Sequence, residues 1–423
     1  MLYMQAGSIY CEGIMLKQPK VRAVSCDYRS SDEEVYQALK RATDPLDAAW
    51  EKLSRARRIA IKFNQDWTRT HVVYHKGERQ QLVGDAVGRA TLRLLQERTR
   101  AELFVIDVGV EPPPQGESRE GTTNLLPVLR AFNVPYVDGN NEPVKWVDVP
   151  GGGSMFDRYP VPRILTEVDE VISVQKMKNH AFMGITLCLK NLFGLMPLPP
   201  AGRPRHYYHH LVRMPYMLAD LGRIFNPALN IIDGMVTQAG MEWGPGQYPR
   251  ICNTLVAGDQ VIATDAVTAA LMGVDPRSDW GTPPFHRDRN ALLIAAQSGF
   301  GTVDLEQIDY QTEVTAPVGD FFAIEMDPRA MIVSWLRSMS EQGLYYRDHR
   351  RQFVDKYAGK YILLQMGAVR WADASGHVNV SRRILSGDHP EQGMWMKYVD
   401  PEEAENEHYE VYEQTLQAIG ALA

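Results

Sequence analysis

Short apolar runs that alternate with helical segments restrict the fold of this chain more than any other feature. The expected strands lie at 21–25, 58–63, 103–108, 134–137, 168–174, 230–233 and 254–257. The expected helices lie at 32–53, 84–97, 123–132, 211–224, 263–272 and 290–298. Most of these strands are almost wholly apolar, as in a sheet that helices cover on both faces. The pattern predicts an α/β fold with a largely parallel sheet and flanking helices.

The alternation of apolar runs and helical segments ends near residue 301, which indicates a second unit in this 423-residue chain. Residues 1–20 are the expected N-terminal extension, and residues 21–300 are the expected α/β core, either as one body or as two lobes divided near residue 150. Residues 301–423 are expected to form a smaller α+β module. In this module we expect a hairpin that turns at 374–376 and a last helix at 401–419, whose acidic first turn suits the helix dipole.

Charge and hydropathy exclude two classes of partner. A net charge of −7 provides no global field that would attract nucleic acid. No stretch approaches the roughly 18 uncharged apolar residues of a membrane span. The N-terminus does not resemble a secretory signal, and the four cysteines are too few and too widely spaced for a disulfide framework or a zinc or iron–sulfur set. We therefore expect a cytoplasmic protein without nucleic-acid or membrane partners, and a homo-oligomer is left open.

The segment after the expected strand at 168–174 carries the strongest functional signal. If the strand continues, its alternation places Lys176, Lys178 and His180 on one face. Ligands of open α/β sheets bind at the carboxyl ends of strands, so an anion or cofactor site is expected here. Further along, Lys190 interrupts an apolar segment, which indicates either a snorkelling side chain or a functional one.

The order of these residues resembles a family known as domain of unknown function 362. The motif elements are KxKxHxxxGxTxxxKNxxGxxP starting at Lys176, then Asp233-Gly234 after a strand, then Asp265 on a helix, with Lys62-x-Asn64 earlier. The resemblance spans about residues 20–300. We expect the cofactor-binding residues at this site to be Lys62, Asn64, Lys176, Lys178, Lys190, Asn191, Asp233 and Gly234. Some relatives carry ferredoxin-like cysteine clusters, which this chain lacks, so no iron–sulfur cluster is expected.

A more remote resemblance is to the nickel-pincer lactate racemase family. It rests on His180-x3-Gly-x-Thr-x3-Lys190 followed by His206, and on Asp66-x-Thr-Arg69. The resemblance implies that His180 is a general base, that Lys190 anchors a nickel-pincer nucleotide covalently and that His206 binds nickel. The catalytic set that we take from it is His180, Lys190, Asp66 and Arg69. Two motifs differ, because Leu-Cys-Leu stands at 187–189 where the family has Gly-Gly-Arg, and no Gly-x-His follows the strand at 103–108.

The residue types also suit the inversion of a carbon that bears a hydroxyl group. A neutral histidine such as His180 suits the base, because its ordinary pKa of about 6.5 lies near working pH. The planar guanidinium of Arg69 suits a clamp for the substrate carboxylate. A metal ion or a nickel-pincer-like nucleotide would have to accept the hydride, since no side chain does so. On a helix, His206 and His210 would stand at i and i+4 and share a metal; the alternative is an exposed cationic and aromatic loop.

Several weaker signals surround this segment. The glycine-rich stretches 151–154 and 234–246 are candidates for holding phosphate through backbone N–H groups. Glu242 is either an acid/base or a turn cap, and Asp107 either orients a substrate hydroxyl, pairs with Lys62 or lies in a surface loop. Cys188 is expected to be a small buried residue.

The sequence therefore supports two hypotheses. The first is an isomerase or oxidoreductase that racemises, epimerises or transfers hydride on a small anionic hydroxy-carboxylate. The second is a binding module that holds an anionic ligand without turnover. The first hypothesis requires the side chains of His180, Lys190 and His206 to converge in one hollow.

Overall fold

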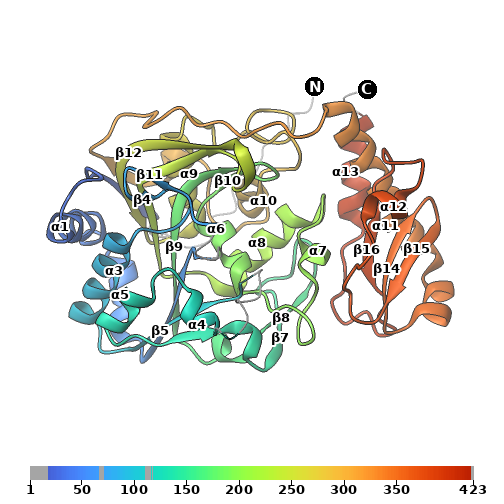
Figure 1. Ribbon diagram of the computed structural model, residues 1–423, viewed down its shortest axis with the longest axis horizontal. Coiled ribbons are helices and arrows are strands. Elements are labelled where there is room, and N and C mark those ends of the chain that lie inside the picture. The colour runs from blue at the N-terminus through green and yellow to red at the C-terminus, as the bar shows by residue number, and fades with distance from the viewer. Residues whose placement is uncertain (1–17, 66–70, 110–115, 117, 421–423) are drawn as a thin grey trace, which may run out of the picture.

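The protein is described by a computed structural model that covers residues 18–65, 71–109, 116 and 118–420. Within these residues the centre is a nine-stranded sheet in the order β13-β1-β12-β11-β9-β2-β5-β6, with β10 beside β9 (Figure 1). The strands are β1 (Lys20–Ser25), β2 (Arg58–Phe63), β5 (Glu102–Asp107), β6 (Tyr136–Asp138), β9 (Glu170–His180), β10 (Gly184–Thr186), β11 (Leu229–Gly240), β12 (Gln247–Gly258) and β13 (Asp309–Thr312). The run from β11 to β6 is parallel, and β12 is antiparallel to both of its neighbours. The predicted α/β class with a largely parallel sheet is confirmed.

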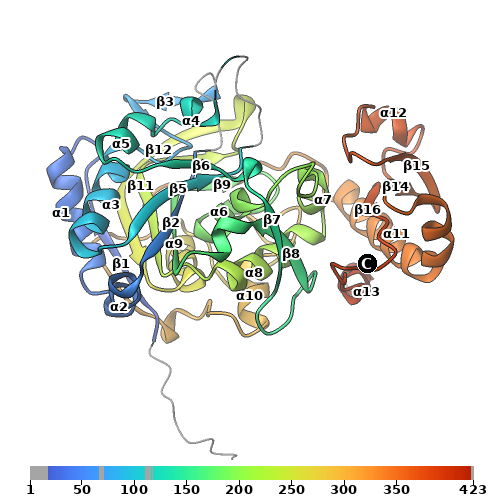
Figure 2. The same cartoon turned by 90° about the horizontal axis from the view of Figure 1, so that it is seen from below.

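Helices cover both faces of this sheet (Figures 1 and 2). They are α1 (Asp32–Thr43), α2 (Asp47–Arg55), α3 (Asp85–Arg98), α4 (Arg119–Thr122), α5 (Leu126–Ala131), α6 (Cys188–Asn191), α7 (Arg205–Tyr208), α8 (Arg213–Phe225), α9 (Val261–Leu271) and α10 (Ala291–Gln297). The helix expected at 32–53 is interrupted between α1 and α2, where Pro45 cannot donate a backbone hydrogen bond. Two short antiparallel pairs lie outside the main sheet, β3 (Tyr74–His75) with β4 (Glu78–Arg79) and β7 (Val144–Asp148) with β8 (Arg158–Pro162).

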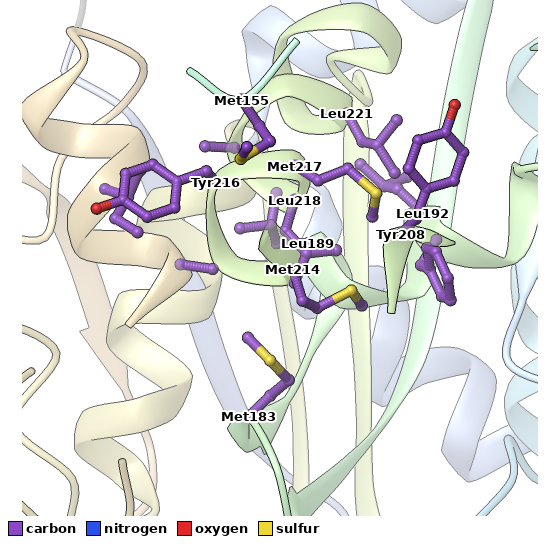
Figure 3. Packing of buried hydrophobic residues seen from close by; sticks show 14 of the residues in the cluster. Met155, Met183, Leu189, Leu192, Tyr208, Met214, Tyr216, Met217, Leu218 and Leu221 are labelled. Atoms are coloured by element: carbon purple, nitrogen blue, oxygen red, sulfur yellow. The ribbon is translucent and has the colours of Figure 1, made fainter. Parts of the chain in front are cut away.

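The buried residues form two hydrophobic clusters, one on each face of the sheet. Alternation along β2 sends Ile59, Ile61 and Phe63 into the cluster beneath α1, α2, α3 and α5, and sends Ala60 into the other. The second cluster lies beneath α6, α8, α9 and α10 and is rich in methionine and leucine (Figure 3). Strands that are buried on both faces explain why the sequence reads as continuous apolar runs.

The C-terminal elements gather at one side of the sheet (Figure 1). They are α11 (Arg329–Tyr357), β14 (Tyr361–Gln365), β15 (Ala368–Asp373), α12 (Arg382–Ser386), β16 (Trp395–Tyr398) and α13 (Glu410–Gly420), and their strands form a sheet in the order β15-β14-β16. Residues just beyond 301 do not belong to this group, because β13 pairs with β1 in the large sheet. The hairpin does not turn at 374–376 either: Met366 and Gly367, with φ of 52° and 72°, form the turn between β14 and β15.

The last helix begins at Glu410 rather than near 401, because the acidic residues before it are drawn into the interior. Glu405 lies 2.9 Å from Arg203 and accepts hydrogen bonds from the hydroxyls of Tyr207 and Tyr208. Glu407 lies 2.7 Å from Arg213, whose side chain is fully buried. These ion pairs connect the C-terminal elements to α7 and α8, and a buried charge is tolerated only when it is paired in this way.

The pKa of Glu407 shows the strength of this pairing. Burial by itself would raise the pKa, but Arg213 and Lys397 outweigh it and lower the pKa from 4.5 to about 2. Because the carboxylate is favoured in the folded state, its stabilising contribution is present above pH 4.5 and is lost only as the pH falls through about 2.

None of the helices among the described residues combines the length and the apolar character needed to cross a membrane.

We predict that Arg203→Met lowers the free energy of unfolding by about 3–5 kcal/mol, because it leaves the buried Glu405 without its cation. Urea unfolding measures the change. The double variant Arg203→Met/Glu405→Gln should recover most of the loss, since no uncompensated charge remains. Arg158→Met, which breaks an exposed pair with Asp148, is the matched control and should cost less than about 1 kcal/mol. Equal losses for the two single variants would contradict the prediction.

Candidate functional site

A cavity of about 500 Å³ lies where β2 and β9 end, between the sheet, α6, α7 and α11. Of the residues expected from the sequence, it is lined by Lys62, Asn64, Lys178, His180, Lys190, Asn191, His206 and His210. The three side chains on which the first hypothesis depends, those of His180, Lys190 and His206, thus line one cavity. Parallel strands that end at one edge of the sheet produce this convergence.

Other residues that the sequence predicted for the site stabilise the fold beside the cavity and do not line it. The ammonium group of Lys176 lies 2.7 Å from the carboxylate of Asp233, and both side chains are almost completely buried. The same carboxylate accepts a hydrogen bond of 2.9 Å from the N–H of Gly84, which precedes α3. At Gly234, a Cβ atom would lie 2.8 Å from the carbonyl oxygen of Thr254, so the strands require glycine there. Lys176 and Asp233 therefore connect β9, β11 and the start of α3.

Asp66 and Arg69, the expected acid/base and carboxylate clamp, lie outside the described residues.

The length of β9 places His180 in the cavity. The strand runs to His180 instead of ending at 174, so Lys176, Lys178 and His180 alternate along it as predicted. A tight connection to β10 follows, with Gly184 at a φ of 72°, where a Cβ would approach the carbonyl oxygen of Pro284 within 2.9 Å. The side chain of Asn179 donates to the carbonyl of Gly184 and closes this turn.

The closest polar contact in the cavity joins His180 to Glu242. Nε2 of His180 lies 2.6 Å from Oε1 of Glu242. Nδ1 accepts hydrogen bonds from the backbone N–H groups of Phe182 and Met183, at 3.0 and 3.3 Å. A nitrogen that accepts N–H groups carries no proton, so the proton of the neutral ring lies on Nε2 and is donated to Glu242. The ring is held in one tautomer from both sides.

The surroundings of His180 favour its neutral form. Burial lowers its pKa well below 6.5, and the nearby charges of Lys190 and Lys178 add to this effect. Oε2 of Glu242 is buried and has no hydrogen-bond partner among the described residues. Glu242 therefore presents one oxygen to His180 and keeps the lone pairs of the other oxygen available.

A second buried pair lies on the β2 side of the cavity. The ammonium of Lys62 lies 3.0 Å from Asp107 at the end of β5, which confirms the predicted pairing. A Cβ atom at Gly194 would lie 2.4 Å from Cε of Lys62, so glycine makes room for this lysine. The side-chain amide of Asn191 donates to the carbonyls of Lys62 and Val174 and so bridges β2 and β9 where they end.

The position of Lys190 depends on Asp265. The carboxylate of Asp265, on α9, accepts the backbone N–H groups of Cys188 and Leu189 at 2.9 and 2.7 Å, which fixes the first turn of α6. Burial raises the pKa of Asp265 from 3.8 to about 8. Lys190 in the same turn is half-buried at the cavity wall, and Cys188 is fully buried, as expected.

The histidines after α6 do not have the predicted helical spacing. Helix α7 ends at Tyr208 and α8 begins at Arg213, so His206 and His210 do not stand on one helix. Both ring nitrogens of His210 lie 3.0 Å from backbone carbonyl oxygens, those of Leu211 and Met394. A metal requires a ring lone pair, which this arrangement does not offer. Within the part of the chain that the structure describes, no group of three or more histidine, cysteine and acidic side chains is placed to hold a metal ion. Among the described residues, the donors therefore do not fit a resident metal.

Neither glycine-rich stretch forms a phosphate loop. The N–H groups of Ser154, Met155 and Phe156, which follow the first stretch, are taken by the buried carboxylate of Asp220. About half of the second stretch belongs to strand β11, and the connection at 241–246, which carries Glu242, joins it to β12.

The cavity also contains residues that the sequence analysis did not single out, namely Phe182, Arg205, Arg287, Asp288 and Met339. Met339 comes from α11, so the C-terminal elements supply part of the wall. Asp288 accepts the N–H of Val212, whose φ of 75° is strained for a β-branched residue. Burial raises the pKa of Asp288 to about 7. Phe182 and Arg205 lie close to the expected residues His180 and His206 in the sequence, whereas Arg287, Asp288 and Met339 reach the cavity from distant parts of the chain.

Comparisons with known proteins place this geometry in context. A thylakoid-associated protein of Synechocystis sp. is 26% identical over 212 residues, and the match covers 46% of this chain and 61% of that protein, so the chain spans less than two thirds of this relative. The lactate racemase apoprotein from Thermoanaerobacterium thermosaccharolyticum has a TM-score of 0.33 and 15% identity, over 55% of this chain and 54% of that chain. A family model described as Domain of unknown function (DUF362) matches residues 59–270, half of the chain. This match confirms the resemblance read from the motifs, and the chain belongs to the family described as Domain of unknown function (DUF362).

Proposed function

We propose that the cavity is the active site of an enzyme that racemises or epimerises a small hydroxy-carboxylate. The observation that carries this proposal is Glu242, which is buried at the cavity wall with one oxygen bonded to His180 and the other without a partner among the described residues. A positioned carboxylate with available lone pairs is suited to accept a proton. Glu242 thus takes the role of general base that the resemblance had implied for His180.

His180 acts in this proposal as a positioning residue. Its Nε2–H is donated to Glu242, while the backbone holds Nδ1. A neutral ring in this tautomer orients the carboxylate without neutralising it. If His180 were protonated, the proton would be shared with Glu242 and the base would be weakened, so the lowered pKa of the ring serves the proposed chemistry.

The cations of the cavity hold the substrate in this proposal. Lys178, Lys190 and Arg205 line the cavity together with Glu242. They bind the substrate carboxylate and stabilise the negative charge that develops on it when Glu242 removes the proton from the adjacent carbon. The electron pair of the broken C–H bond passes into the substrate carboxylate, and a proton from the ammonium of Lys190 returns to the opposite face. A nucleotide-derived cofactor in the same cavity would supply a hydride acceptor, and Glu242 would then take the hydroxyl proton.

A binding module for an anionic ligand is the second candidate, because the same cations would hold such a ligand without turnover. The two candidates differ in whether Glu242 performs chemistry.

We predict that the protein, incubated with enantiopure 2-hydroxy acids in D₂O, incorporates deuterium at the carbon next to the carboxylate as it inverts that carbon. Glu242→Gln should lower the rate at least about 100-fold while ligand binding is retained. Proton NMR measures the exchange, chiral chromatography measures inversion, and calorimetry measures binding. Glu391→Gln, in the exposed pair with His389, is the matched control and should leave the rate unchanged.

The outcomes separate the candidates. Exchange that depends on Glu242 supports proton transfer. Inversion without deuterium incorporation would replace proton transfer with hydride transfer. Binding without exchange or inversion, for every acid tested, would reject the enzyme in favour of the binding module.

We also predict that His180 remains neutral at pH 6. Its folded pKa lies well below the unfolded value of 6.5, so lowering the pH through 6.5 protonates the unfolded chain first and removes stability, without charging the folded ring. Nitrogen-15 NMR should show a protonated Nε2 and an acceptor Nδ1 across this range. A resonance that titrates near 6.5 in the folded protein would contradict the prediction.

A further inference from the structure

The cavity is large for a small hydroxy acid. Its volume of about 500 Å³ falls within the range of roughly 300–1,000 Å³ that accommodates drug-sized ligands. Its lining combines polar side chains, among them Glu242, His180 and Lys178, with an apolar wall of aromatic and methionine side chains. The apolar residues are Phe182, Met183, Phe193, Met214, Trp243 and Met339. A substrate that contacted only the polar side would leave this wall in contact with water.

Aromatic rings lie beside His180, the residue proposed to position Glu242. The ring centroids of Phe182 and Trp243 lie 5.3 Å apart, and those of His180 and Trp243 lie 6.2 Å apart, with interplanar angles of 61° and 80°. His209 extends the cluster at 5.8 Å from His180 and 5.9 Å from Phe182. These edge-to-face and stacked arrangements place an aromatic cluster beside His180.

The exposure of these rings distinguishes them from core residues. Phe182 and Trp243 are both half-buried, whereas Phe193, Met183 and Met214 are each less than a tenth exposed to solvent. Figure 3 shows Met183 and Met214 within the buried hydrophobic cluster, to which their side chains also belong. The guanidinium of Arg287 covers Phe182 at 4.3 Å, so a cation already stacks against one ring. The rings of Phe182 and Trp243 are therefore accessible to a ligand in the cavity.

We infer that the substrate is a hydroxy-carboxylate that carries an aromatic ring, which packs against Phe182 and Trp243 while its carboxylate meets the cations. This inference rests on the proposed function and specifies its substrate class. The flexible methionine side chains of this wall allow it to adapt to the shape of the aromatic ring of the substrate.

The test compares phenyllactate with lactate, two probes that share the hydroxy-carboxylate and differ by the ring. Calorimetry on Glu242→Gln, which is expected to bind without turnover, should give phenyllactate an affinity at least roughly tenfold higher than lactate. Adding Trp243→Leu should reduce this preference to roughly threefold or less and leave the affinity for lactate unchanged. Adding Trp243→Phe, which restores a ring, should recover most of the preference and guards against a folding defect.

Each result has a distinct meaning. Equal affinities for the two probes, or a Trp243→Leu change that weakens both equally, would overturn the aromatic substrate class while carboxylate binding survives. Failure of both probes to bind would count against the proposed function itself. A preference that depends on the Trp243 ring supports the inference.

Discussion

Buried ion pairs determine which elements of this protein are neighbours, because an unpaired buried charge is costly. Lys176 with Asp233 and Lys62 with Asp107 are pairs of almost completely buried side chains in the main sheet. Arg213 with Glu407 repeats the arrangement at the C-terminal elements. An ion removed from water must find its partner in the folded state, so each pair requires particular strands or helices to lie together. The pairs therefore specify which elements are neighbours, while the apolar clusters supply most of the favourable burial.

The pair at the cavity differs from these structural pairs. The surroundings of His180 favour its neutral form. Its ring donates to the carboxylate of Glu242, whose second oxygen has no hydrogen-bond partner among the described residues. In the structural pairs each carboxylate lies within 3.0 Å of a lysine or arginine side chain. An incompletely satisfied buried carboxylate is costly, and proteins retain such groups where they perform chemistry or bind a ligand. This contrast is the physical basis for assigning the cavity a function in a family whose function is described as unknown.

The motif residues divide into two roles that the linear pattern does not separate. Successive alternate positions on β9 have different roles. Lys176 pairs with Asp233 on β11 and supports the structure, whereas Lys178 and His180 line the cavity. Asp265 belongs to the motif and yet acts at a distance, by holding the turn that carries Lys190. The motif therefore includes residues that hold the elements around the site in place as well as residues that line the site.

The sequence by itself determined the α/β class, most of the strands and the alternation that carries His180, because apolar periodicity is a local property of the chain. It also singled out Lys190 and left the pairing of Lys62 with Asp107 as one of three alternatives, which the structure shows to be present. Only the tertiary structure decided that Glu242 contacts His180 and that Met339 joins the cavity, since these residues lie far away along the chain. The same holds for the segment before α13. A local acidic pattern favoured a helix there, but the buried Arg203 before α7 and Arg213 on α8 pair with Glu405 and Glu407 in the interior. The energy of pairing a buried charge outweighs helix propensity, and that energy exists only once the distant partner is in place.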